Sequence, residues 1–357
     1  MLKHLEYYKP DVDKTFALMT KLFDDAYARK GGNVTFIAYP PVEGFGPSLD
    51  LTTYNWDTDV ERYADDLCAI KASEWEARRD IDDCSFPLMT EYLGIGDFSA
   101  LVAGDITFMP ETSWSKPSLK ELRDYKALPQ LGSTYWYGKV LEVIEALLQR
   151  VAPTGIPYMR GYFAPLDLAN ALRGDQIYMD FYDDPDGVHE LLDYCATATI
   201  RYAEDVAALT HKYLGHTKYG MWYLEGSIAM SEDIACMCSP KVYREFALPH
   251  TQRVIDHFGR GYMHTHSRAM YLVKEVCDLR SATSLWLATD PNQPRPIDMV
   301  EDLVRDGNGV CLSIDCERFE EIEENFGEMQ KGNFTVALPV KDMEEGIRLT
   351  EKFERLG

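Results

Sequence analysis

Short β-prone runs alternate with amphipathic helical stretches along the chain from about Thr154 onward. The runs are bounded by turn residues, and the stretches between them carry apolar residues at helical spacing. The predicted strands are Tyr158–Phe163, Lys218–Leu224, Gly261–His264, Thr283–Ala288, Val310–Ile314 and Phe334–Leu338. Repeated βα units of this kind predict a parallel sheet, and this many in succession favour a closed barrel over an open sheet.

The predicted helices in this part of the chain have recognisable ends. One runs from Pro165 to Arg173 and stops at Gly174. A long helix follows Asp184-Pro185, an N-cap with proline at the first helical position, and its apolar stripe extends from Val188 to Leu209. Further helices are predicted from Ser239 to about Phe258 with a kink at Pro249, from Met270 to Cys277, and from Asp342 to Leu356.

The first 150 residues are less regular. A helix (Val12–Arg29), a strand (Asn33–Ala38) and a second helix (Asp57–Arg78) precede a loop-rich stretch from Ile81 to Ser118. No repeat of fixed period and no low-complexity linker divides the chain. We therefore expect an α/β protein in which residues 1–357 form one (β/α)8 TIM-type barrel domain, with a less regular N-terminal extension within residues 1–150.

The composition is that of a globular protein with a large core and an acidic surface. Hydrophobic residues make up 46% of the chain, and 59 acidic residues against 36 basic ones give a formal net charge of −23. Such a charge repels phosphate backbones and anionic lipids, so we expect neither a nucleic-acid nor a membrane partner. No stretch approaches the ~18 apolar residues that a membrane-spanning helix needs.

Cysteine usage and the N-terminus indicate a cytoplasmic protein. The eight cysteines are scattered from Cys68 to Cys316, too sparsely for a disulfide scaffold, so we expect reduced thiols. Met1 to Glu6 does not begin a basic segment followed by an apolar run, so we expect no signal peptide.

Two histidines at a strand end are the first candidate for chemistry. His264 and His266 follow Gly261-Tyr262-Met263, and because side chains alternate along a strand they share one face, within reach of one metal ion. The alternative is a pair of hydrogen-bonded polar histidines in a substrate pocket.

Two further residues follow apolar strands. Glu225 ends Met221-Trp222-Tyr223-Leu224 and precedes a glycine, a position that suits a general acid/base or a metal ligand. A helix-capping or salt-bridged glutamate is the alternative. Cys316 could add a metal ligand at the end of Val310–Ile314, although a lone buried cysteine more often packs as a small hydrophobe.

Aromatic residues and an arginine lie at the same strand ends. Arg160 and Tyr162 on one strand, with Trp222 and Tyr223 on another, suit a planar or partly apolar substrate that has an anionic group for Arg160. No GxGxxG, Walker, GxSxG, HExxH or EF-hand pattern occurs in the sequence, which argues against dinucleotide, nucleotide, serine-hydrolase and zincin chemistry.

Several segments resemble the uroporphyrinogen decarboxylase superfamily. They are GYFAPLDLANALRG (161–174), FYDDP (181–185) with the long helix after it, and SPKVYREFALPH (239–250), which is close to the family's S-P-x-x-(F/Y)-x-x-F-x-x-P helix. The similarity continues through the His264 region to the last helix and is looser from Pro87 to Gly104. The resemblance implies a (β/α)8 barrel and either tetrapyrrole decarboxylation or zinc-dependent methyl transfer to or from a corrinoid protein.

A missing decarboxylase motif and a partial match to the metal site of the methyltransferases place the chain nearer the methyltransferase branch. The arginine-rich N-terminal motif with which the decarboxylases grip substrate carboxylates is missing. The methyltransferases have His-x-Cys where this chain has His264-Thr265-His266, and an acidic residue where Glu225 falls. The resemblance thus implies a zinc site of His264, His266 and Glu225, with Cys316 as a further candidate. An imidazole in place of a thiolate leaves the ion a stronger Lewis acid.

The leading hypothesis is therefore a zinc-dependent methyltransferase that moves a methyl group between a small molecule and a corrinoid protein or thiol. Arg160, Tyr162, Trp222 and Tyr223 would bind the small molecule. One alternative is a metal-free decarboxylase or lyase in which Glu225 and the histidines move protons, and whose activity would survive metal removal. The other is a non-catalytic barrel that binds a corrinoid or tetrapyrrole without turnover.

Overall fold

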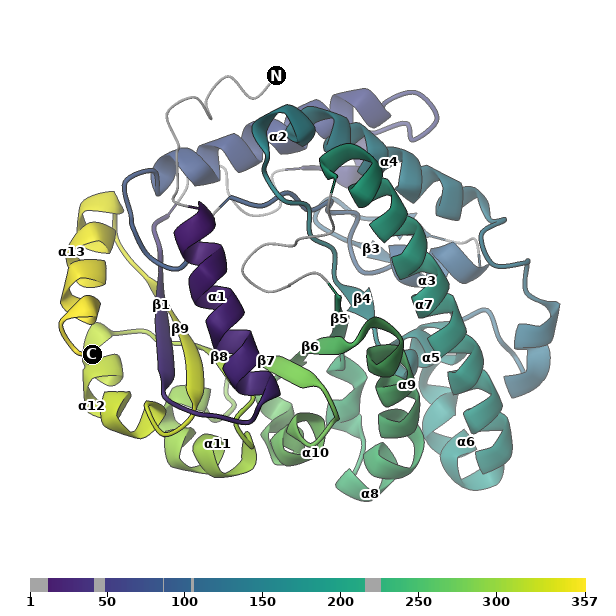
Figure 1. The fold of residues 1–357 in the computed structure, drawn as a ribbon. Helices are drawn as coiled ribbons and strands as arrows, with labels where there is room; N and C mark the ends of the chain where they lie inside the picture. Colours follow the sequence, from purple (N-terminus) through teal and green to yellow (C-terminus); the bar gives the residue numbers. More distant parts are fainter. Residues whose placement is uncertain (1–11, 42–48, 86, 104–105, 216–225) are drawn as a thin grey trace.

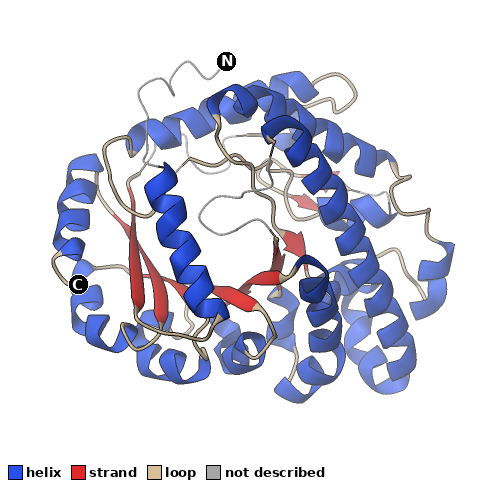
Figure 2. Ribbon diagram, in the orientation of Figure 1, coloured by secondary structure: helices blue, strands red, loops and turns tan. Residues whose placement is uncertain are grey.

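A parallel sheet of seven strands forms the centre of the protein (Figure 2). The computed structural model describes residues 12–41, 49–85, 87–103, 106–215 and 226–357. The sheet order is β1-β9-β8-β7-β6-β5-β4, and every neighbouring pair is parallel. The strands are β1 (Asn33–Tyr39), β4 (Tyr162–Phe163), β5 (Ser227–Ser231), β6 (Arg260–His266), β7 (Ala282–Ala288), β8 (Cys311–Asp315) and β9 (Asn333–Pro339). The predicted parallel sheet is confirmed.

Helices surround this curved sheet (Figure 1). They are α2 (Val60–Ala77), α3 (Asp97–Ala103), α4 (Tyr135–Val151), α5 (Pro165–Arg173), α6 (Ile177–Asp183), α7 (Pro185–Leu214), α8 (Pro240–Val242), α9 (Leu248–Phe258), α10 (Val273–Cys277), α11 (Val300–Asp306), α12 (Phe319–Met329) and α13 (Met343–Glu354). Their apolar faces and the outward side chains of the strands form one continuous core. A small hairpin of β2 (Thr107–Phe108) and β3 (Ser113–Trp114) lies outside the sheet.

Helix α1 (Val12–Tyr27) lies at the amino ends of the strands. Asp24 on this helix pairs with Arg260, the first residue of β6, at 2.7 Å, and Arg29 just beyond the helix donates to the carbonyl of Leu279, ahead of β7. Apolar side chains of α1 pack with Ile37 of β1 and Cys311 of β8. The helix therefore closes this end of the sheet and leaves the carboxyl end for a functional site.

The edge strands β1 and β4 are not paired with each other, so no closed barrel is seen in the described part of the sheet. A non-strand segment touches both edges. The backbone N–H of Cys84 donates to Phe36 on β1, at 3.2 Å, and Met89 forms a parallel bridge with Tyr158, just before β4. The predicted α/β fold with a parallel sheet, here of seven strands, is thus confirmed, and the closed barrel stays a prediction.

Local signals located most of the helices well. The structure has α5 with the predicted bounds, and α7 begins after Asp184, whose side chain accepts a hydrogen bond from the Gly187 backbone as an N-cap. The predicted helix from Ser239 to Phe258 is broken into α8, a π-helical turn (Tyr243–Ala247) and α9, because Pro249 has no N–H to donate to the preceding turn. Helix α4 was not anticipated in the less regular N-terminal region.

One predicted strand lies outside the described residues. Residues 218–224 belong to the part of the chain that the structure does not describe, and the strand that joins the sheet between β4 and β6 is β5, Ser227–Ser231. Glu232 and Asp233 follow β5 directly, so they are the carboxylates that the described chain brings to this edge of the sheet.

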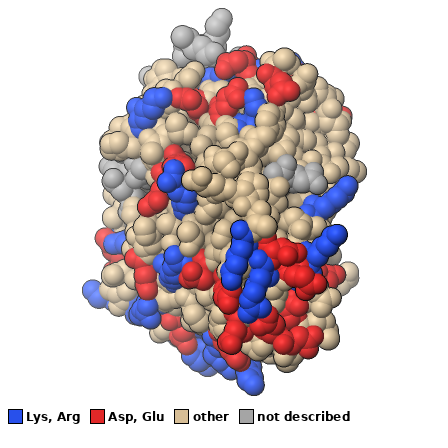
Figure 3. All heavy atoms as spheres, turned by 90° about the vertical axis from the view of Figure 1, so that its right-hand side faces the viewer, with Lys and Arg blue, Asp and Glu red and all other residues tan. Residues whose placement is uncertain are grey.

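None of the described helices is both long enough and apolar enough to cross a bilayer. All eight cysteines are free thiols. On the face shown in Figure 3, basic side chains lie among acidic ones, mainly over the lower half of the view, rather than in a patch of their own.

Candidate metal site

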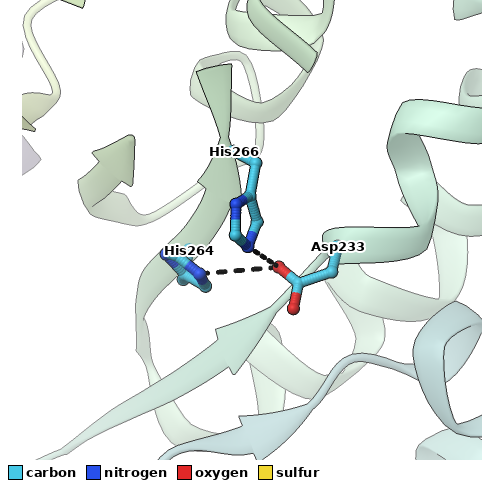
Figure 4. A group of neighbouring side chains, drawn as sticks. All are labelled: Asp233, His264 and His266. Carbon is cyan, nitrogen blue, oxygen red and sulfur yellow. Dashed lines mark ion pairs between the residues drawn. The ribbon is translucent and has the colours of Figure 1, made fainter. Parts of the chain in front are cut away.

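Three ligand atoms converge at the carboxyl ends of β5 and β6 (Figure 4). His264 and His266 are two of the last three residues of β6, and Asp233 is the second residue after β5. Oδ1 of Asp233 lies 3.5 Å from Nε2 of His264 and 3.5 Å from Nε2 of His266. The two imidazole rings have centroids 5.1 Å apart. The predicted sharing of one face by the two histidines is confirmed.

The backbone after β5 is fixed to β6 by hydrogen bonds. The N–H of Glu232 donates to the carbonyl of His264 at 2.8 Å, and the hydroxyl of Thr265 donates to the carbonyl of Glu232 at 3.2 Å. Asp233 therefore has a defined position relative to both histidines before any ligand binds.

A buried carboxylate below the site holds the same turn. Asp167, in the first turn of α5, accepts hydrogen bonds from the backbone N–H groups of Asp233 and Ile234 and from the hydroxyl of Ser231, each at 3.0 Å. Burial raises the pKa of Asp167, and the neighbouring charges of Asp233 and Glu232 raise it further. Asp167 thus holds the Asp233 turn in position.

His266 is oriented by a second carboxylate. Its Nδ1 lies 3.0 Å from Oδ1 of Asp290, just after β7, and this contact places the proton on Nδ1 and leaves Nε2 as an acceptor facing Asp233. Burial alone would raise the pKa of Asp290, but hydrogen bonds from the backbone of Arg268 and from His266 outweigh it and lower this pKa. In metal-binding histidines, one ring nitrogen typically donates its proton to a carboxylate while the other nitrogen binds the metal, and His266 with Asp290 has this arrangement.

The donor set fits a divalent transition metal. Oδ1 of Asp233 is screened from solvent yet accepts no hydrogen bond from any residue that the structure describes. Burial lowers the pKa of His264, and the adjacent His266 lowers it further against the opposing charge of Asp233, so the imidazole stays neutral and can donate a lone pair. Two imidazole nitrogens and one carboxylate oxygen suit catalytic zinc with open positions, and the same set suits Fe(II).

The buried carboxyl groups near the three ligands also favour a cation, because a nearby positive charge stabilises their ionised forms. Glu232 is fully buried, and burial raises its pKa to about 7 although Thr251 and Tyr243 donate hydrogen bonds to it. Together with Asp167 and Asp233 it makes three neighbouring carboxyl groups. A bound divalent ion would offset this charge.

The structure adds a carboxylate that was not predicted as a ligand. Glu225, Trp222 and Tyr223 lie outside the described residues, so their predicted roles stay predictions. The acidic residue that the described part of the chain does bring to the histidines is Asp233, which the sequence reasoning missed. The signal for it was the Glu232-Asp233 pair directly after Ile228-Ala229-Met230, a short apolar run between two serines.

Cys316 is not in the group of ligand atoms gathered among the described residues. Asp315 at the end of β8 faces the cavity described below, and because side chains alternate, the next residue turns away from it. Cys316 is buried, and burial raises the pKa of its thiol to about 12, which disfavours the thiolate that a metal needs. The alternative, that Cys316 packs as a small hydrophobic residue in the core, agrees better with its burial.

Arg160 is placed at the cavity but is already neutralised. Its guanidinium pairs with Glu91 and, at 2.7 Å, with Asp97, and all three side chains are almost fully buried. It also stacks on the rings of Phe98 and Tyr202. Arg160 therefore lines the cavity with its guanidinium engaged by two carboxylates of the chain, and its role with an anionic substrate group stays a prediction.

A cavity of about 910 Å³ lies inside the curve of the sheet and reaches the candidate metal site. Tyr162, predicted to contact the substrate, lines it. Each of the seven strands contributes to its wall, with Tyr39, Tyr162, Ser231, His264, Trp286, Asp315 and Ala337 among the lining residues. Asp233 lines it too, so a small molecule inside the cavity can approach the metal ligands.

Neither a scan against protein-family models nor a search of curated proteins gave a match.

Proposed function

We propose that this protein is a zinc-dependent methyltransferase of the uroporphyrinogen decarboxylase-like superfamily, which moves a methyl group between a small molecule and a corrinoid protein or thiol. The observation that carries the proposal is the convergence of Asp233, His264 and His266 on one point at the carboxyl edge of a parallel sheet. The reaction class is taken from the segments that resemble the family. The proposal of a metal rests on the geometry of the three ligands.

We also propose that the seven strands are the wall of a (β/α)8-type barrel. Side chains from all seven line one cavity, as in a sheet wrapped around an axis. The segment that contacts β1 at Phe36 and bridges to Tyr158 occupies the position of the remaining wall. The metal ligands would then stand where barrel enzymes place their active sites.

Zinc held by Asp233, His264 and His266 would act as a Lewis acid that favours the anionic form of a methyl acceptor. The residues of the chain have separate tasks. Asp290 keeps the proton of His266 on Nδ1, so that Nε2 remains a ligand. Asp167 holds the backbone that carries Asp233. The buried walls of the cavity, Tyr162 among them, keep water away from the reacting groups.

The metal-free decarboxylase is less well supported. That alternative needs an arginine to bind substrate carboxylates, and the guanidinium of Arg160 is occupied by Glu91 and Asp97. The non-catalytic barrel does not account for a histidine that is oriented by a carboxylate behind it. The decarboxylase and the non-catalytic barrel are therefore tested as alternative outcomes of the experiment below.

The deciding experiment is zinc binding by the whole protein. Apo protein prepared with a chelator is titrated with zinc in a calorimeter, and one ion per chain is expected. His264→Ala and His266→Ala should each abolish tight binding, because two protein ligands hold zinc far more weakly than three. His257→Ala, which removes an exposed histidine paired with Glu204, is the matched control and should bind like the parent.

Unchanged zinc binding in both ligand variants would refute the assigned site. Full activity after removal of all metal would instead favour the decarboxylase. Tight corrinoid binding without turnover by the zinc-loaded protein would favour the non-catalytic barrel.

A further inference from the structure

The basic side chains that line the cavity are all matched by carboxylates of the chain. In the described part of its wall these bases are Lys71, Arg78 and Arg160. Lys71 pairs with Glu74 at 2.9 Å, Arg78 pairs with Asp83 at 2.7 Å, and Arg160 is shared by Glu91 and Asp97. No positive charge on these three side chains is left over for a substrate anion.

One acidic residue of the wall has no such match. Asp315, the last residue of β8, lines the cavity and forms no ion pair with any described residue. It is half-buried, and burial raises its pKa although the backbone of Thr289 lowers it. A carboxylate held in such surroundings costs free energy that a cationic partner would recover.

Two aromatic residues line the cavity together with Asp315. Trp286, on the adjacent strand β7, is 37% exposed, and its ring packs beside the imidazole of His264 with the centroids 4.3 Å apart. Tyr39 lies at the end of β1, two strands away from β8, and is also partly exposed. The negative charge of Asp315 is among the causes that raise the pKa of Tyr39, after burial. Rings beside a carboxylate are the usual surroundings of a bound methylated cation.

The strand register relates this position to the metal site. His266 pairs with Ala288 on β7, and Asp315 lies at the same level on the next strand, β8, opposite Ala337 on β9. Two strand spacings separate the two positions, about 10 Å along the sheet. A small molecule can therefore contact Asp315 while its other end lies beside the metal ligands.

We propose that the cavity binds a substrate with a methylated cationic group, a quaternary ammonium or a sulfonium, with Asp315 as counter-ion and Trp286 and Tyr39 as ring contacts. This deepens the proposed function by naming the class of its small-molecule substrate. It also predicts that polycarboxylates are poor ligands, because Lys71, Arg78 and Arg160, the bases in the described part of the wall, already pair with carboxylates of the chain.

Three probes of nearly equal size and different charge test the proposal. Tetramethylammonium, tert-butanol and pivalate carry one positive charge, none and one negative charge. Each is titrated into the full-length protein in the presence of a chelator, and binding is followed by broadening of the methyl proton resonance of the probe. We expect the cation to bind at least tenfold more tightly than the alcohol, and pivalate to bind most weakly.

Variants tie the preference to one residue. Asp315→Asn should weaken tetramethylammonium binding about tenfold and leave tert-butanol unchanged, whereas Asp315→Glu should keep the preference for the cation. Glu317→Gln removes the same charge two residues further on, from an exposed side chain that does not line the cavity, and should change nothing. The circular dichroism of each variant must match that of the parent.

Equal binding of the three probes, or a cation preference that survives in Asp315→Asn, would overturn the proposal. Because these titrations are run without metal, their outcome does not depend on the zinc site. If the cation binds as expected but zinc does not, the proposed function fails while the cation site stands. The reverse result leaves the zinc site and removes the substrate class.

Discussion

Removal of the buried guanidinium of Arg160 should destabilise the protein strongly. The variant Arg160→Met keeps much of the side-chain volume but leaves Glu91 and Asp97, which are 1% and 3% exposed, without a cation. Breaking a buried ion pair by deleting one partner costs about 3–5 kcal/mol, because the other charge stays buried and uncompensated. We expect the free energy of unfolding at pH 7 to fall by that amount.

The loss should shrink at lower pH. A carboxyl group without its counter-ion is protonated more readily in the folded than in the unfolded state, so its contribution to stability is full below about pH 4 and is lost as pH rises. Burial raises the pKa of Asp97 even in the parent, so we expect the change of the deficit with pH to come mainly from Glu91, at up to about 1.4 kcal/mol per pH unit.

Urea unfolding of the parent and of Arg160→Met at pH 7 and pH 5 measures the loss in the free energy of unfolding and its dependence on pH. A deficit of about 3–5 kcal/mol at pH 7 should fall to roughly 1–2 kcal/mol at pH 5. Arg305→Met is the control, since that arginine is 65% exposed and its pairs with Asp302 and Asp306 are solvated, so the change should be within about 1 kcal/mol. A deficit below 1 kcal/mol at pH 7, or one that does not change with pH, would refute the reasoning.

Three further changes are expected to have defined effects. Asp290→Asn should weaken zinc binding about 10–100-fold in calorimetry, because His266 loses the carboxylate that orients it; unchanged affinity would contradict this. Gly94→Ala should cost about 3 kcal/mol or more in urea unfolding, since Gly94 has φ +77° and a Cβ would overlap the backbone of Ser113, whereas Gly155→Ala, at φ +71° with open space around it, should cost about 1 kcal/mol. Asp342→Ala should cost about 1 kcal/mol in the same assay by removing the N-cap of α13, and no loss would contradict the cap.

Features set by short-range patterns could be predicted from the sequence. Pro165 and Gly174 fixed both ends of α5, because proline suits the first turn of a helix and glycine its end. The shared face of His264 and His266 follows from the two-residue period of a strand, which needs no knowledge of the rest of the fold. Both results depend on residues within one element.

Features that depend on distant residues could not be predicted in this way. Arg160 pairs with Glu91 and Asp97, which lie more than sixty positions earlier in the chain, so nothing near it shows that its charge is engaged. The strand that carries Asp233 is identified by its pairing with β4 and β6 rather than by its own composition. Because β5 was not predicted, Asp233 was not considered as a ligand.

The histidine at position 266 brings with it a requirement that a cysteine would not. A thiolate ligand needs no acceptor behind it, whereas an imidazole ligand has a second nitrogen whose proton must be held on the far side of the ring. Asp290 meets this requirement from the end of the neighbouring strand β7. An incidental polar histidine at a cavity rim has no need of such a partner. The His266–Asp290 pair is therefore evidence for a metal site that is independent of the convergence of the three ligands.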